Sequence, residues 1–122
     1  MTVKTENKTY QCSFEFALDM VSGKWKSLVL YYLSEDTLRY GEIRKKIDGI
    51  TQKMLTQTLR DLEKNGLISR KIYPVVPPKV EYTITQSGAQ LIPIFHSLQA
   101  WGGRVAIEQG VAIACDTKSE KC

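Results

Sequence analysis

The residues best suited to chemistry lie between Gly49 and Ile68, in the stretch GITQKMLTQTLRDLEKNGLI. On a helical wheel of about 100° per residue, leucines occupy one side and polar residues occupy an opposite arc of about 140°. This polar face, which holds no carboxylate, comprises Gln52, Lys53, Thr56, Gln57 and Arg60. An ordinary solvated helix mixes acids and bases at four-residue spacing, so a face of amides, hydroxyls and cations indicates a specific contact surface.

Such side chains suit the bases and phosphates of double-stranded DNA. A glutamine can pair with adenine through two hydrogen bonds, an arginine or lysine with guanine, and a threonine can contact a base edge or the thymine methyl group. Thr51 is expected to cap the helix, whose N-terminal N–H groups can bind a phosphate. Taken alone, the helix also fits the alternative of a surface that only confers solubility.

The neighbouring segments predict elements that would present this helix to DNA. LRYGEIRKKI predicts a preceding helix and DGI a tight turn, which together give a helix-turn-helix arrangement. LISRKIY and KVEYTIT, joined by PVVPP, predict a half-buried β-hairpin behind it. Further cations on these segments are added to the candidate DNA contacts: Arg39, Arg70, Lys71 and Lys79. The expected fold class is α+β, mainly α, with a winged helix-turn-helix.

The remaining segments predict helices near Ser13, over GKWKSLVLYYL and after Thr85, where Pro93 should kink or interrupt the last helix. An apolar seam runs along this last helix from Leu91 to Val105. A single winged domain offers little core to cover the seam, so we expect a homodimer that buries it and reads a palindrome. Packing of the helix on its own domain is the alternative.

Composition limits the other classes of function. The 122 residues fit one domain, the net charge of +4 is mildly basic, and no apolar run is long enough for a membrane span or secretory signal. We therefore expect a cytoplasmic protein that binds no membrane. Three cysteines without paired spacing and one histidine predict neither a metal site nor a cofactor. The chain lacks catalytic motifs, which argues against an enzyme.

Several segments together resemble the HxlR-type winged helix-turn-helix regulators of bacteria: SGKWKSLVLYYL, LRYGEIRKKIDGITQKMLTQTLRDLEKNGLISR, YPVVPPKVEYTIT and the later WG. The resemblance covers about Cys12 to Gly102 and implies a dimeric, cytoplasmic transcriptional regulator with dimerisation through the first and last helices. It also implies a recognition helix at Thr51 to Lys64 and a wing tip at Val75 to Lys79. The expected organisation is a flexible arm at 1–11, the DNA-binding domain with its dimerisation helices at 12–109, and a polar tail at 110–122.

Cys12 is the candidate sensor residue. It precedes a predicted helix, and helix N-termini lower the pKa of a thiol. The resemblance implies that relatives sense oxidants or electrophiles through an N-terminal cysteine at this position, which would make Cys12 a switch controlled by a small-molecule effector. The alternatives are a ligand-responsive regulator in which Cys12 is structural, and a winged-helix adaptor that binds protein. Cys115 and Cys122 could pair with Cys12 or be incidental.

Overall fold

A computed structural model describes residues 9–113, which divide into two compact units with the boundary between Gln90 and Leu91. The predicted tail at 110–122, with Cys115 and Cys122, falls mainly on residues 114–122, which lie outside the described residues, as does most of the predicted arm. The domain boundaries at 12 and 109 stay a prediction.

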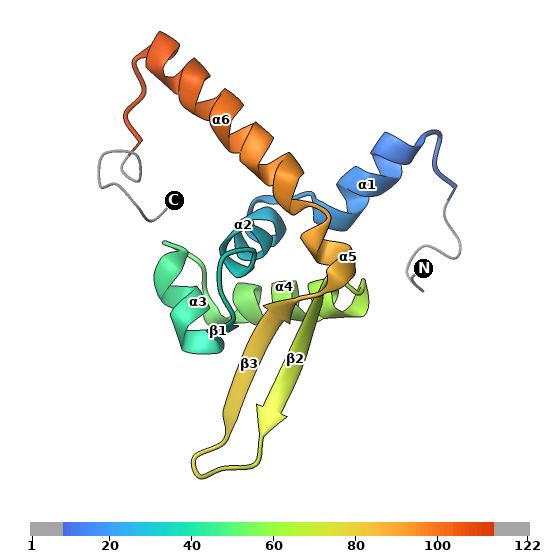
Figure 1. Ribbon diagram of the computed structural model, residues 1–122, viewed down its shortest axis with the longest axis vertical. Coiled ribbons are helices and arrows are strands. Elements are labelled where there is room, and N and C mark those ends of the chain that lie inside the picture. Colours follow the sequence, from blue (N-terminus) through green and yellow to red (C-terminus); the bar gives the residue numbers. More distant parts are fainter. Residues whose placement is uncertain (1–8, 114–122) are drawn as a thin grey trace. The chain divides into compact units, whose positions relative to one another are not determined.

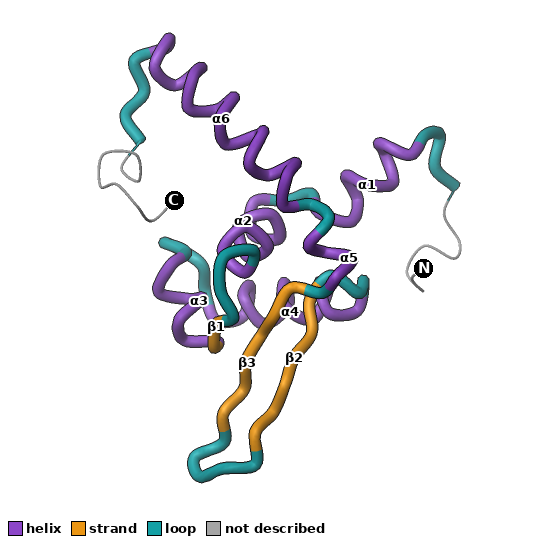
Figure 2. The backbone as a smooth tube through the Cα atoms, in the orientation of Figure 1, coloured by secondary structure: helices purple, strands orange, loops and turns teal. Residues whose placement is uncertain are grey.

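The first unit has the architecture of a winged helix-turn-helix, as predicted (Figure 1). Its elements, in chain order, are α1 (Ser13–Val21), α2 (Lys24–Leu33), β1 (Leu38–Arg39), α3 (Tyr40–Lys46), α4 (Gln52–Lys64), β2 (Ile68–Tyr73), β3 (Lys79–Ile84) and α5 (Gln86–Ala89). The strands form an antiparallel sheet in the order β1-β3-β2, and β2 and β3 project from the helices as a hairpin (Figure 2). The class is therefore mainly α with a small sheet.

Strand β1 corrects one expectation. LRYGEIRKKI was expected to be helical from its first residue, but Leu38 and Arg39 pair with Tyr82 and Glu81 of β3, and α3 begins at Tyr40. The Glu42 carboxylate accepts a hydrogen bond from the Arg39 N–H at 2.8 Å, which satisfies one of the free donors at the helix start. The first turn of the predicted helix is thus replaced by a strand that widens the sheet.

Helix α4 is fixed to the first unit by its leucines. Leu55, Leu59 and Leu62 are buried at 0%, 3% and 0% exposure, in agreement with the helical wheel. Helices α2 and α4 pack together, and Val29 and Leu30 of α2 are fully buried. Each buried leucine of this kind stabilises a fold by roughly 1.5–3 kcal/mol, so the apolar side of α4 fixes which side faces outward.

Both ends of α4 are defined by local chemistry. The Thr51 hydroxyl accepts a hydrogen bond from the Met54 N–H at 3.1 Å, which confirms the predicted N-cap. At the other end, Gly66 has φ of +80°, and the N–H groups of Gly66 and Leu67 donate to the carbonyls of Glu63 and Leu62. This pair of bonds is a Schellman motif, which favours glycine at the left-handed position.

The hairpin has two different faces. On one face, Ile68 and Tyr82 are buried at 2% and 9% exposure, as the predicted alternation requires. On the same face nearer the tip, Ile72 is 58% exposed, so the core contact ends partway along the hairpin. The outer part of the hairpin therefore has solvent on both faces and is free to contact another molecule.

The second unit is dominated by α6 (Ile92–Gln109). The helix begins beside Pro93, which stands in its first turn, so the predicted interruption is confirmed: Thr85 caps the short helix α5, and the long helix starts anew. Ile94, Leu98 and Trp101 are spaced four and three residues apart and are 58%, 61% and 56% exposed. Among the described residues, no helix combines the length and apolar character needed to cross a membrane.

Candidate nucleic-acid interface

The polar face of α4 is the best-formed candidate interface. Gln52, Lys53, Gln57 and Arg60 are exposed, Thr56 is half-buried, and all five line one shallow depression of the surface. The structure therefore places the five sequence-predicted side chains side by side on the outer surface. An exposed helix face of this kind fits the width of the DNA major groove.

Two side chains of the polar face are held by neighbours. The Gln57 amide nitrogen donates to the Asp61 carboxylate at 3.1 Å. Because an ionised carboxylate only accepts hydrogen bonds, this contact fixes which end of the amide faces Asp61 and leaves the carbonyl oxygen for a partner. Thr56 Oγ1 lies 3.2 Å from the Tyr40 hydroxyl, which donates to the Gln52 carbonyl oxygen at 3.0 Å.

A second group of charges lies on the outer face of the sheet. Glu81 in the central strand is directly opposite Arg39 of β1 on one side and Lys71 of β2 on the other. The Lys79 ammonium lies 3.5 Å from the Glu81 carboxylate, which also accepts a hydrogen bond from the Tyr73 hydroxyl at 3.0 Å. We call Arg39, Lys71, Tyr73, Lys79 and Glu81 the wing cluster. Three predicted DNA-contacting cations thus surround one acid.

The Tyr73 ring organises the lysines of the wing cluster. The ammonium groups of Lys71 and Lys79 each lie 4.9 Å from its centroid, within the range of a cation–π contact. These contacts hold two flexible side chains over one ring at the outer part of the hairpin. The wing cluster is therefore a positioned group of cations.

Arg70 stands apart from the wing cluster. It points to the opposite face of the hairpin, where its guanidinium lies 3.9 Å from the Glu63 carboxylate of α4. Burial raises the pKa of Tyr82 on the same face, and Arg70 acts against this shift through its charge and a hydrogen bond. Arg70 therefore links the hairpin to α4, and its contact with DNA stays a prediction. So does a DNA contact by Thr51, whose hydroxyl caps α4.

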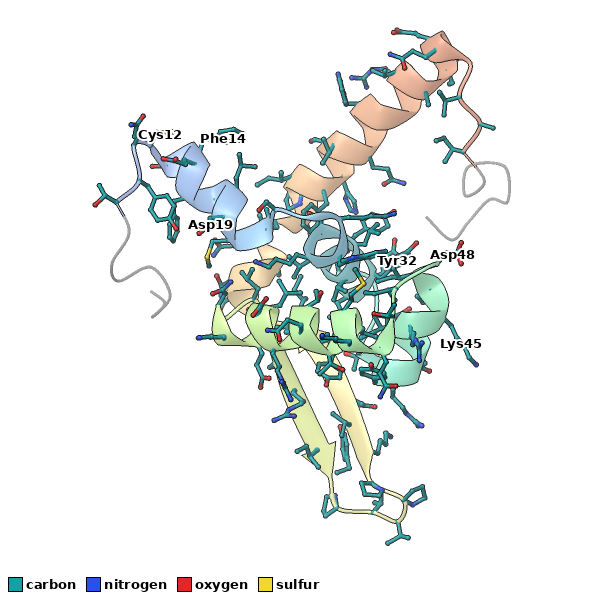
Figure 3. All side chains as sticks on the ribbon, turned by 180° about the vertical axis from the view of Figure 1, so that it is seen from behind. Cys12, Phe14, Asp19, Tyr32, Lys45 and Asp48 are labelled. Carbon is teal, nitrogen blue, oxygen red and sulfur yellow. The ribbon has the colours of Figure 1, made fainter. Side chains whose placement is uncertain are left out.

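Cys12 is the N-cap residue of α1 and is exposed, with a free thiol (Figure 3). The segment before it is held to α1, because the Tyr10 hydroxyl donates to the Asp19 carboxylate and the Tyr10 ring meets Phe16 edge to face at 5.2 Å. The hydrogen bond to Asp19, with smaller contributions from burial and nearby acids, raises the pKa of Tyr10 to about 12. Within residues 9–113, no three histidine, cysteine or acidic side chains are grouped as a metal site would require.

Sequence reasoning missed four residues of these sites: Tyr40, Asp61, Tyr73 and Glu81. Asp61 lies four residues after Gln57, a spacing at which helical side chains meet, so its pairing with the amide was open to inference. Glu81 stands two residues after Lys79 in one strand, where side chains share a face, so this ion pair was also open to inference. Tyr40 and Tyr73 gave no such signal, because the residues that their hydroxyls contact lie on other elements.

A winged helix-turn-helix with an exposed polar face on its second motif helix defines a class of transcriptional regulators. Residues 20–109 match the HxlR-like helix-turn-helix family, and the chain belongs to that family. It is 54% identical over 93 residues to an uncharacterized HTH-type transcriptional regulator of Methanothermobacter thermautotrophicus, covering 76% of this chain and 71% of the relative. It is 50% identical over 102 residues to the HTH-type transcriptional regulator YkvN of Bacillus subtilis, covering 84% and 86%.

Solved structures support the same class. The reduced form of the redox regulator HypR superposes with a TM-score of 0.75 at 41% identity, covering 80% of this chain and 99% of HypR. The protein is therefore an HTH-type transcriptional regulator by family, fold and similarity.

Proposed function

We propose that this regulator binds a palindromic operator in double-stranded DNA as a cytoplasmic homodimer, with the polar face of α4 in the major groove. The observation that carries the proposal is the acid-free set of exposed side chains from Gln52 to Arg60, opposite a buried row of leucines. The wing cluster supports it, since its cations suit phosphates beside the groove. A cytoplasmic location follows, because the chromosomal DNA of bacteria and archaea lies there.

The adaptor alternative has less support. A protein-binding helix would present an apolar patch. The exposed side of α4 is instead polar, and a single large apolar residue of this helix, Met54, is exposed, at 41%. Contact with DNA accounts for both the residue types and their arrangement.

A salt titration combined with two substitutions tests the DNA contact. The logarithm of affinity for duplex DNA should fall linearly with the logarithm of salt concentration, with a slope set by the number of phosphates contacted. Gln57→Ala should reduce discrimination at one base pair by about 1–3 kcal/mol and leave random-sequence binding nearly unchanged. Lys79→Ala should instead weaken all sequences alike. If Lys79→Ala left random-sequence binding intact, the assignment of the wing cluster to phosphates would be wrong.

The homodimer part of the proposal is supported by the exposed stripe of Ile94, Leu98 and Trp101 on α6. A charge in this stripe should dissociate a dimer that buries it. Sedimentation velocity on Leu98→Glu should therefore show monomers, while Gln99→Glu, an exposed position away from the stripe, should remain dimeric. Dimers in both variants would exclude this stripe as the interface.

A second proposed function is control by thiol chemistry at Cys12. Its exposure and free thiol make it accessible to an oxidant or electrophile, whereas the structural alternative expects a buried side chain. The similarity to the redox regulator HypR also supports control by thiol chemistry. Treatment with diamide or a quinone should change operator affinity in the wild type and in a Cys115→Ser/Cys122→Ser variant, but not in Cys12→Ser. Unchanged wild-type affinity would exclude the switch.

A further inference from the structure

Tyr40 joins α3 to the polar face of α4. It is the first residue of α3 and is half-buried. Its hydroxyl lies 3.0 Å from the Gln52 carbonyl oxygen and 3.2 Å from Thr56 Oγ1. These contacts span 12 and 16 residues of sequence and reach the first two turns of α4.

The hydrogens of this small network can be assigned from chemistry alone. A carbonyl oxygen only accepts, so the single hydrogen of the Tyr40 hydroxyl is donated to Gln52. The contact between Tyr40 and Thr56 then requires Thr56 to donate its own single hydrogen. Thr56 Oγ1 is left with lone pairs, so toward any outside partner it acts as an acceptor.

This polarity limits which base edges Thr56 can bind. In the major groove the donors are the exocyclic amino groups of adenine and cytosine, and the oxygens of thymine and guanine only accept. A threonine with a free hydroxyl could serve either kind of edge. A threonine that has already donated to Tyr40 can form a hydrogen bond only with the amino group.

We propose that Tyr40 is a positioning residue that sets the hydrogen-bond direction of Thr56, so that α4 selects adenine or cytosine at the base facing Thr56. The proposal rests on the proposed DNA-binding function. It assigns a role in specificity to a residue outside the polar face, and it predicts which chemical group of the operator is read at one position.

Selection from a pool of randomised duplexes tests this. The wild type should recover adenine or cytosine at one position of each half-site. Tyr40→Phe keeps the ring and frees the Thr56 hydroxyl, so discrimination at that position should fall by about fivefold, the loss of one modest base contact. Thr56→Val should reduce discrimination between bases at the same position. The double variant should lose no more discrimination there than either single variant. The slope of random-sequence affinity against salt should not change.

Tyr10→Phe is the matched control, because it removes a tyrosine hydroxyl that donates to Asp19 of α1 and leaves α4 and the wing cluster intact. It should leave every base preference unchanged. A Tyr40→Phe profile identical to the wild type at all positions would overturn the proposal. So would a preference for thymine or guanine at the position that Thr56→Val relaxes, an outcome that can be read even if Tyr40→Phe fails to fold. A wild type that binds duplexes without any selection would refute the sequence-specific function itself.

Discussion

Neutralising Glu81 should strengthen binding to DNA of any sequence. Glu81 lies among three cations of the wing cluster, directly opposite Arg39 and Lys71 and 3.5 Å from the Lys79 ammonium. Replacing it with glutamine removes the one acid of the cluster and keeps an oxygen that can accept the Tyr73 hydroxyl. Lys79 is then released to bind a phosphate.

The size of the effect follows from the added unit of charge. A unit charge about 7 Å from a phosphate in water contributes about 0.6 kcal/mol, or roughly threefold in affinity. If Lys79 gains one full phosphate contact, counterion release makes the gain in DNA affinity roughly eightfold larger at about 0.1 M salt than at 1 M. We therefore expect Glu81→Gln to raise random-sequence affinity by about threefold to eightfold per wing, and by the square of that factor if both wings of a dimer contact the duplex.

Stability should change little. The Lys79 and Glu81 side chains are 35% and 24% exposed, and an ion pair at the surface contributes about 0–1 kcal/mol. A gain in affinity can therefore be separated from a change in folding by measuring both quantities for the same variant.

Fluorescence anisotropy with a labelled random-sequence duplex between about 50 and 200 mM salt measures the affinity and its salt slope. Glu108→Gln is the matched control, because it makes the same change of net charge at an exposed position on α6. The slope should steepen by up to about 0.9 per wing for Glu81→Gln and change little for Glu108→Gln. Equal gains in both variants, or no gain for Glu81→Gln, would refute the placement of the wing cluster against phosphates.

Three further predictions concern stability, each measured by urea unfolding at fixed protein concentration. Gly88→Ala should lower the free energy of unfolding by about 1–3 kcal/mol, because the new Cβ would clash with the Leu67 carbonyl oxygen and lie 2.8 Å from Ile84 Cγ1. The control Gly41→Ala places its Cβ in open space and should be neutral or stabilising by about 0.4–1 kcal/mol. Equal unfolding midpoints for the two variants would contradict the clash. Leu55→Ala, at a fully buried site, should lower the free energy of unfolding by about 2–5 kcal/mol. Met54→Ala, at a site that is 41% exposed, should lower it clearly less. Similar losses in both variants would mean that α4 is not held by its leucine side. Burial raises the pKa of Tyr82, so its contribution to the free energy of unfolding is fully present below the unfolded pKa of about 10 and is lost as pH rises through the higher folded value. Tyr82→Phe should therefore show a smaller decline in stability above pH of about 10 than the wild type. An unchanged decline would contradict this assignment.

The sequence alone determined the features that depend on local periodicity. Leucines recurring at helical spacing placed the polar face of α4 outward, and burial of Leu55, Leu59 and Leu62 confirms it. Proline and glycine signalled where elements end, because each restricts or extends the backbone angles available at its own position. Gly66 at the end of α4 and Pro93 at the start of α6 are both found as expected.

Only the tertiary structure decided which distant residues meet. Strand β1 has two residues and no periodicity of its own, and it exists because Leu38 and Arg39 pair with β3. That pairing brings Arg39 beside Glu81. The register between β2 and β3 places Arg70 opposite Tyr82, on the other face of the hairpin. Likewise, the Tyr40 hydroxyl reaches Thr56 across the turn between two helices. Periodicity reports which side of an element is buried, but where the partner of a polar group lies on another element, it is set by packing between elements, which no local pattern encodes.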